Sequence, residues 1–241
     1  MRSIELENLT WIEVERQISN YQLALIALGA RTKEHGPHLQ LNNDYLFAEY
    51  LKERVKGQIP AIVLPTLQYG YYPAFIEYPG SVTLKKETFC NLVVEICLSI
   101  SRFGISKFYI LNTGVSTLQP LEQAAMILYE ENITLEYFDI LNFSKDLPVN
   151  LLIQEGGSHA DEEETSIMLY IAPDTVDMSK AVKDLDLRPN RKGLTRDPSG
   201  NGTYSPTGIY GDPTLATREK GKVIVDSMIS AIIKQIKSMI E

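Results

Sequence analysis

The sequence alternates short, almost wholly apolar runs with longer segments of helical period. The apolar runs are residues 22–28, 61–67, 107–112 and 134–141. The segments of helical period are residues 44–55, 87–103 and 121–132, and a last one spans about 217–240. A continuous apolar run is typical of a strand buried on both faces, as in parallel sheets covered by helices. The alternation therefore predicts an α/β fold with a mostly parallel sheet between helices.

The chain has 241 residues, of which 44% are apolar, and this is enough to bury a sizeable core. It shows no internal repeat and no clear linker, so we expect a single domain over residues 1–241. Its apolar runs are far shorter than the roughly 20 residues that span a bilayer, and its N-terminus lacks the apolar region of a signal peptide. We therefore expect a cytoplasmic protein that does not insert into a membrane.

With 23 basic and 31 acidic side chains, the net charge is −8. This balance argues against a nucleic-acid partner, because nucleic-acid binding needs a basic surface.

Cys90 and Cys97 are seven residues apart in a predicted helix, so their Cα atoms lie roughly 10 Å apart, too far for a disulfide. We expect two free thiols in the core. No CxxC motif is present, so the three histidines and the carboxylates must carry any site chemistry.

Polar segments follow three of the predicted strands, at residues 33–44, 67–73 and 112–117. In parallel sheets, binding sites form beyond the carboxyl ends of the strands, so we expect these segments to meet at one rim. In the 112–117 loop, a glycine between small polar residues suits close approach of a ligand, although a plain turn fits equally well. The segment 184–212 is rich in Gly, Pro, Asn, Ser and Arg and predicts an ordered loop or a lid.

The first polar segment gathers Lys33, Glu34, His35, His38 and Asp44 within a dozen residues. Imidazole and carboxylate together are typical ligands of zinc or manganese. The spacing also fits a structure in which Asp44 is a carboxylate at a helix N-terminus and the histidines are hydrogen-bonded in a loop. The spacing alone leaves both interpretations open.

The third histidine, His159, precedes four consecutive acidic residues that end at Glu164. Runs of acidic residues are usually exposed to solvent or occupy the first turn of a helix. His159 and Glu164 bracket the run, and they would face inward together if the segment is helical from about Asp161. This pair is the second candidate for site chemistry.

Several motifs resemble the creatininase, or creatinine amidohydrolase, family, and together they cover nearly the whole chain. The segment His35-Gly36-Pro37-His38-Leu39, with Asp44 downstream, is similar to the family's Glu-Gln-His-Gly-Pro-His-Leu segment. His159-Ala160 with Glu164-Thr165-Ser166 is similar to its His-Ala-Gly-Glu...Glu-Thr-Ser motif. Further similarities lie at Tyr69-Gly70-Tyr71 and at residues 79–84 and 211–221.

The resemblance implies a three-layer α/β/α fold, a homo-oligomer that is often a hexamer, and hydrolysis of an amide or cyclic amide C–N bond in a small molecule. Family members hold two metal ions, and His35 and Asp44 match ligand positions. Three other ligand positions, which hold glutamate, histidine and glutamate in the family, hold Lys33, Val115 and Thr117 in this chain. An ammonium group repels a divalent cation and valine offers no lone pair, so we do not expect two coupled metals.

Our leading hypothesis is an amidohydrolase with one divalent metal, zinc or manganese. His35 and Asp44 would hold the metal, and Glu34 would complete the site if a bulge turned it inward. A water molecule on the metal would be the nucleophile.

The expected catalytic residues are His159, Glu164 and Lys33. His159 would be the general acid or base, oriented by Glu164, and Lys33 would bind a substrate carboxylate or stabilise an oxyanion. The expected substrate-binding residues are Tyr69, Tyr71, Thr113, Gly114 and Ser116. The alternative is a metal-free ligand-binding protein or pseudoenzyme, in which Lys33 replaces the charge of a metal by pairing with Asp44 or Glu164.

Overall fold

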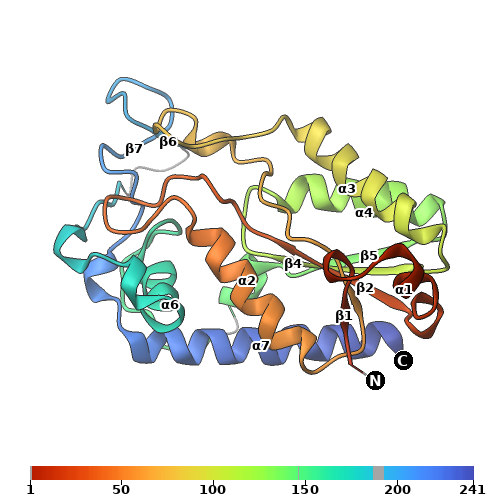
Figure 1. Cartoon of the computed structure of the whole chain (residues 1–241). Coiled ribbons are helices and arrows are strands. Elements are labelled where there is room, and N and C mark those ends of the chain that lie inside the picture. The colour runs from red at the N-terminus through yellow and green to blue at the C-terminus, as the bar shows by residue number, and fades with distance from the viewer. Residues whose placement is uncertain (1, 146, 187–192) are drawn as a thin grey trace.

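The main sheet lies at the centre of the molecule, and all of its paired strands are parallel (Figure 1). The computed structural model describes residues 2–145, 147–186 and 193–241. Over that part of the chain, the sheet has five strands in the order β1–β3–β2–β4–β5. They are β1 (Ile4–Glu5), β2 (Leu23–Leu28), β3 (Ile62–Val63), β4 (Lys107–Asn112) and β5 (Thr134–Tyr137). β2 and β4 pair from Leu23 opposite Lys107 to Leu28 opposite Asn112, so both strands end at the same edge.

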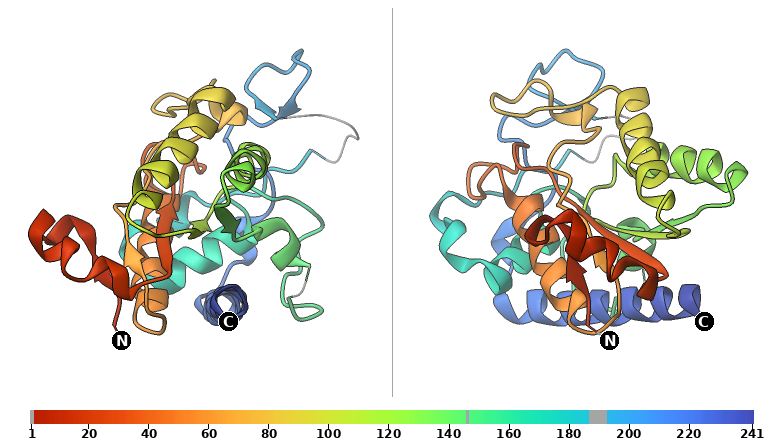
Figure 2. Two further views of the ribbon diagram at one scale, coloured as in Figure 1. Left: turned by 90° about the vertical axis from the view of Figure 1, so that its right-hand side faces the viewer. Right: turned by 45° about the vertical axis from the view of Figure 1, so that its right-hand side comes forward.

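Helices cover both faces of this sheet (Figures 1 and 2). The long helices are α2 (Asn43–Lys56), α3 (Lys86–Ser101), α4 (Leu118–Glu130), α6 (Glu162–Ile171) and α7 (Arg218–Ile240). The odd-numbered residues of β2 lie in one buried cluster with α2, α6 and α7. The even-numbered residues lie in a second cluster with α3 and α4. The structure therefore confirms the predicted α/β class, with a mostly parallel sheet in a three-layer α/β/α arrangement.

Two predicted strands are shorter than their apolar runs. β3 covers only two residues of the run 61–67, because Pro65 has no N–H group for the sheet, although Leu67 still forms a parallel bridge with Leu28. The predicted strand 134–141 was wrong beyond Tyr137. Asp139 accepts a hydrogen bond from the backbone N–H of Asn142 and begins the short helix α5 (Ile140–Ser144).

The predicted helices are present with small shifts at their ends. The helix α1 (Trp11–Glu15) begins with a capping box between Thr10 and Glu13. In α3, Cys90 and Cys97 are both buried and free, as predicted. No helix within the described ranges combines the length and the hydropathy needed to cross a bilayer.

The predicted loop or lid at 184–212 contains a small second sheet. Its strands β6 (Leu194–Thr195) and β7 (Thr203–Tyr204) are parallel, and residues 187–192 lie outside the described residues. The Tyr78 hydroxyl donates to the backbone oxygen of Ser205 at 2.8 Å and so ties this segment to the rest of the molecule. The expectation of one domain stays a prediction.

Candidate active site

A cavity of about 550 Å³ lies beyond the carboxyl ends of β2 and β4. Its wall combines the segment after β2, the loop after β4, the first turns of α2 and α6, and parts of β6 and β7. The polar residues of this wall include Lys33, Asn43, Asp44, Thr113, Ser116, His159, Glu163 and Glu164. The predicted rim is therefore present, and it encloses a volume large enough for a small molecule.

The close packing at this edge depends on Gly29, which directly follows β2. A Cβ atom at this position would lie 2.1 Å from the backbone oxygen of Asp44, so only glycine lets the first turn of α2 approach the strand. Gly36 has φ +69°, in the left-handed region that favours glycine, and turns the chain between His35 and His38. These two glycines bring the first polar segment back over the strand end.

Lys33 and Asp44 form a buried ion pair. The Lys33 Nζ lies 2.7 Å from Asp44 Oδ2, and the two side chains are 5% and 3% exposed. Burial opposes the charge on Lys33, but the carboxylates of Asp44 and Glu164 outweigh it and raise the pKa of Lys33. Burial likewise opposes the charge on Asp44, but Lys33 and His35 lower its pKa. Both groups are therefore ionised at neutral pH.

The imidazole of His35 is held between two acceptors. Its Nδ1 is 2.9 Å from the backbone oxygen of Lys33, and its Nε2 is 2.7 Å from Asp44 Oδ1. A carbonyl oxygen only accepts, so Nδ1 carries a hydrogen. Nε2 lies at hydrogen-bond distance from a carboxylate oxygen. With Lys33 beside its other oxygen, Asp44 is contacted by a nitrogen group on both sides.

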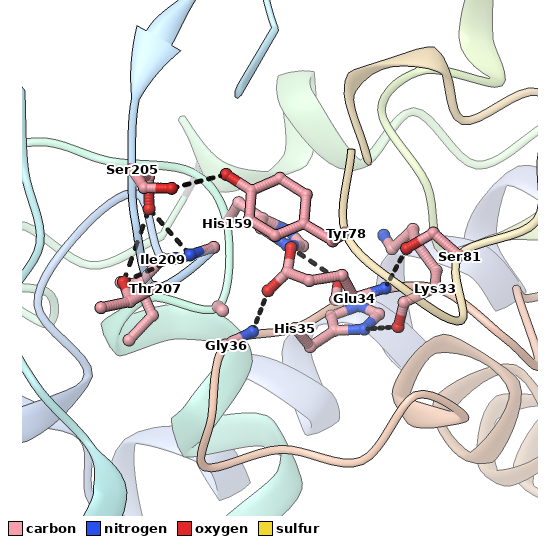
Figure 3. A network of polar contacts seen from close by, with 12 residues as sticks. Lys33, Glu34, His35, Gly36, Tyr78, Ser81, His159, Ser205, Thr207 and Ile209 are labelled. Atoms are coloured by element: carbon pink, nitrogen blue, oxygen red, sulfur yellow. Dashed lines mark hydrogen bonds and ion pairs between the residues drawn. The ribbon is translucent and has the colours of Figure 1, made fainter. Parts of the chain in front are cut away.

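Glu34 points toward His159 (Figure 3). The His159 Nε2 is 3.1 Å from Glu34 Oε2 and 3.0 Å from the Glu34 backbone oxygen. Glu34 also accepts from the backbone N–H of Gly36. Burial raises the pKa of Glu34, but the hydrogen bond and charge of His159, together with the Gly36 N–H group, outweigh burial and lower it. The carboxylate of Glu34 is engaged by His159 and is not among the donors that come together around His35, so the structure does not place it as a third ligand beside His35 and Asp44.

The other ring nitrogen of His159 lies beside Glu164. Nδ1 is 3.5 Å from Glu164 Oε2, which also accepts from the backbone N–H of Ala160 at 2.5 Å. The helix α6 begins at Glu162, with Asp161 as its N-cap, so His159 and Glu164 come together at the helix N-terminus as expected. Burial is the main cause of a raised pKa at Glu164.

The loop after β4 is held together by Asn112. Its side-chain oxygen accepts from the Thr117 hydroxyl at 2.6 Å, and its side-chain nitrogen donates to the Gly114 backbone oxygen at 2.8 Å. Thr117 is fully buried in this network and does not line the cavity, whereas Val115 lines it with an apolar side chain. Neither residue offers a metal ligand to the cavity.

The predicted substrate-binding residues divide into two groups. Thr113, Gly114 and Ser116 line the cavity, but Tyr69 and Tyr71 do not. Tyr69 is 47% exposed, and Tyr71 packs against the core cluster of α3 and α4. Their placement differs from the prediction because the chain bends into a 3₁₀ turn at Pro73–Phe75 and directs the next tyrosine inward.

Three further residues of the wall were not predicted from the sequence. Tyr72 and Phe75 place their rings near the Lys33 ammonium, with centroids 5.5 and 4.8 Å from Nζ. Glu163 lines the cavity from α6, and burial together with Asp161 raises its pKa to about 8. An aromatic run before Pro73 was the only signal for Tyr72, and Phe75 follows that proline. The sequence contained no signal for Glu163, because this residue stands in a run of acidic residues, and such runs are usually exposed.

A family profile described as creatinine amidohydrolase matches residues 7–236. The chain belongs to the creatininase family. It is 28% identical to the creatinine amidohydrolase of Pseudomonas putida, over 98% of this chain and 97% of that protein. It is also 28% identical to a mycofactocin precursor peptide peptidase of Mycolicibacterium smegmatis, over 89% and 84%. A solved structure described as "Creatininase Mn" superposes with a TM-score of 0.85, at 25% identity and 99% coverage of both chains.

Known creatininase structures carry manganese or, in a mutant described as Zn-Zn type, zinc. The described residues of this chain do not fit a two-metal site. An ammonium is paired with Asp44, and Val115 and Thr117 supply no ligand. One triad of donors does come together, because ligand atoms of His35, His159 and Glu164 lie within 4.8 Å of one another. The Lys33 charge near Glu164 opposes a cation there.

Proposed function

We propose that this chain hydrolyses the C–N bond of a small-molecule amide or cyclic amide, with the Lys33 ammonium in the place of a metal ion of the family. One observation carries the proposal: a fixed cation and an imidazole–carboxylate pair face the same cavity. The Phe75 ring lies close to both Lys33 and His159, since its centroid is 4.8 Å from Lys33 Nζ and 4.3 Å from the centroid of the His159 ring. Relatives of this chain include a creatinine amidohydrolase and a peptide peptidase, whose names describe cleavage of this bond type.

Lys33 would bind the oxygen of the substrate carbonyl. An ammonium group has three donors, and Asp44 takes one of them. The remaining donors would stabilise the negative charge that develops on this oxygen when the carbonyl is attacked. The surroundings of Nζ are aromatic and buried, so the charge is poorly screened and acts strongly at short range.

His159 would be the general base through Nδ1. Its Nε2 faces the backbone oxygen of Glu34, which only accepts, so the hydrogen of the neutral ring lies there. The lone pair on Nδ1 then removes a proton from the attacking water as the new C–O bond forms. The same proton passes to the leaving nitrogen when the C–N bond breaks, so the products are a carboxylic acid and an amine. Glu164, whose pKa is raised, shares this proton beside Nδ1.

Glu34 would position this base. Its carboxylate contacts Nε2 and not the cavity, so it fixes the ring orientation and stabilises the imidazolium that forms. In this proposal Glu34 acts through His159 and does not touch the substrate.

A second candidate keeps the amidohydrolase reaction but uses one divalent metal, zinc or manganese. The observation that favours it is the triad of His35, His159 and Glu164. A metal bound by these residues would supply a Lewis acid and lower the pKa of a bound water. Binding would require Lys33 to move away from Glu164, or the two cations would repel one another.

The test uses untagged protein, dialysed against a chelator and assayed for metal content. We expect hydrolysis of at least one compound in a panel of linear and cyclic amides that includes creatinine, with less than about 0.2 metal per chain. Activity that appears only with added zinc or manganese would support the one-metal candidate and overturn the first.

Two variants and a control complete this test. His159→Gln and Lys33→Met should each lower kcat by about a hundredfold or more, the typical effect of losing a general base or an oxyanion donor. Lys234→Met removes an exposed lysine from α7 and should leave turnover unchanged. If no amide is turned over but ligands still bind, the chain is a metal-free binding protein. The homo-oligomer implied by the family stays a prediction, which light scattering would test.

A further inference from the structure

Among the described residues of the cavity wall, one carboxylate, that of Glu163, has neither a cation nor a main-chain N–H group beside it. The acidic residues of the wall are Asp44, Asp161, Glu163 and Glu164. Asp44 is paired with Lys33, Glu164 lies beside His159, and Asp161 accepts from two main-chain N–H groups of α6. Among the described residues, only a hydroxyl reaches the carboxylate of Glu163: the Ser144 Oγ lies 3.1 Å from its Oε1.

The hydroxyl of Ser144 satisfies Glu163 poorly. The same oxygen is 2.9 Å from the backbone oxygen of Ile140, one turn earlier in α5. A hydroxyl has one hydrogen, and a carbonyl oxygen only accepts, so Ile140 and Glu163 compete for it. The Glu163 carboxylate therefore keeps most of its acceptor capacity for a group inside the cavity.

A second acceptor without a partner among the described residues belongs to a residue of the same wall. Asn43 lies at the start of α2, lines the cavity and is 4% exposed. Its side-chain oxygen has no hydrogen-bond partner within the part of the chain that the structure describes. An unpaired buried amide oxygen is unfavourable, so a ligand group that donates a hydrogen bond to this atom would stabilise the complex.

The described wall contains no free cation to complement these acceptors. Lys33 is the one lysine or arginine among the described lining residues, and its charge is taken up by Asp44. Burial and the neighbouring Asp161 raise the pKa of Glu163 to about 8, and a cationic ligand beside this group would favour its ionised form, whereas an anionic ligand would oppose it.

We propose that Glu163 and Asn43 form a subsite for a positively charged nitrogen group, an ammonium or a guanidinium, carried by the amide substrate. The inference rests on the proposed function, because it names the substrate class of the same cavity. Such a group donates several charge-assisted hydrogen bonds, which matches a carboxylate and an amide oxygen that lack donors. Ile140 and Leu141 line the same wall and would contact the carbon chain between the cation and the amide.

The test compares amides whose far end carries a positive, a neutral or a negative group. The probes are 4-aminobutanamide and 4-guanidinobutanamide, which are cationic, pentanamide, which is neutral, and succinamate, which is anionic. Dissociation constants are measured by ligand-observed NMR, so the experiment needs no turnover. We expect wild-type protein to bind at least one cationic probe about tenfold or more tightly than pentanamide, and succinamate most weakly.

Glu163→Gln keeps the size of the side chain and removes its charge. This variant should lose the preference for the cationic probes while its affinity for pentanamide stays within about twofold. Glu95→Gln is the matched control, because Glu95 is an exposed carboxylate on α3, and it should keep the full preference. Asn43→Ala should reduce the preference severalfold, which provides an independent test if Glu163→Gln folds poorly.

A preference that survives in Glu163→Gln would overturn the inference, as would wild-type protein that binds pentanamide or succinamate as tightly as the cationic probes. The outcome is separable from that of the proposed function. A Glu163-dependent preference without turnover of any amide would support the subsite and reject the hydrolase. Turnover of neutral amides without any such preference would support the hydrolase and reject the subsite.

Discussion

Replacing Lys33 by glutamate tests whether this ammonium stands in for a metal ion. The Lys33–Asp44 pair is almost fully buried, with an N–O distance of 2.7 Å. Lys33→Glu removes the cation and adds a carboxylate next to Asp44 and near Glu164. Breaking a buried pair by removing one partner typically costs about 3–5 kcal/mol. For a chain of this size, each kcal/mol lowers Tm by about 2–4 °C, so we expect a fall of about 6–20 °C in chelator.

The same substitution should create a requirement for metal. It restores a carboxylate at a ligand position of the family, beside His35 and Asp44. If the position is otherwise preserved, zinc at about a hundred times its Kd would stabilise the variant by about 2.7 kcal/mol and recover about 5–11 °C of Tm. Scanning calorimetry in chelator and in excess zinc measures both effects, and elemental analysis gives the occupancy.

Lys33→Met is the matched control, because it removes the charge without adding a donor. It should lower Tm in both conditions, and zinc should not rescue it. The reasoning would be refuted by a Lys33→Glu variant as stable in chelator as wild-type protein, or by zinc rescue of the methionine variant to the same extent. Equal zinc stabilisation of wild-type protein would show that Lys33 does not exclude the ion.

Three further predictions concern other parts of the chain. Glu34→Gln should lower kcat about tenfold with little change in KM, because Glu34 contacts His159 and not the cavity. Steady-state kinetics on any amide substrate would check this prediction. A change in KM alone would contradict it. Glu163 has a folded pKa of about 8, above its ordinary value of 4.5, so its neutral form stabilises the fold and this contribution is lost as pH rises from 4.5 to 8. Urea unfolding should therefore show Glu163→Gln gaining stability over wild-type protein at pH 8 and losing that advantage near pH 5. Burial raises the pKa of Cys97 to about 12, so this thiol should react with a disulfide reagent only after unfolding, and reaction in the native state would contradict its burial.

The layers of the fold were predictable because the apolar runs around β2 and β4 are typical of strands buried on both faces and alternate with segments of helical period. The ends of the elements were less so. They depend on single residues such as Pro65 and Asp139, whose effect is decided by whether a neighbouring strand or helix competes for the same backbone groups. A local sequence pattern does not show which neighbouring strand or helix competes for these backbone groups.

The candidate site was predictable in its residues and less so in their contacts. The sequence left two partners open for Lys33, and the structure selects Asp44. Neighbouring residues of an extended segment face opposite sides, so Glu34 points away from Asp44, and no bulge turns it inward. Asn43 and Glu163 carried no signal, because the importance of an acceptor depends on the donors that tertiary packing brings to it.

This chain differs from the family motif at two adjacent positions. Where the resembled segment has glutamate and then glutamine, this chain has Lys33 and Glu34. The first change places a cation on Asp44, where the family has metal ions, and the second places a carboxylate on His159. An ammonium withdraws less electron density from a carbonyl than a divalent metal does, so catalysis with Lys33 needs a better base. In the proposed mechanism Glu34 would strengthen that base from outside the cavity, and the two differences together would replace metal chemistry by charge and proton transfer.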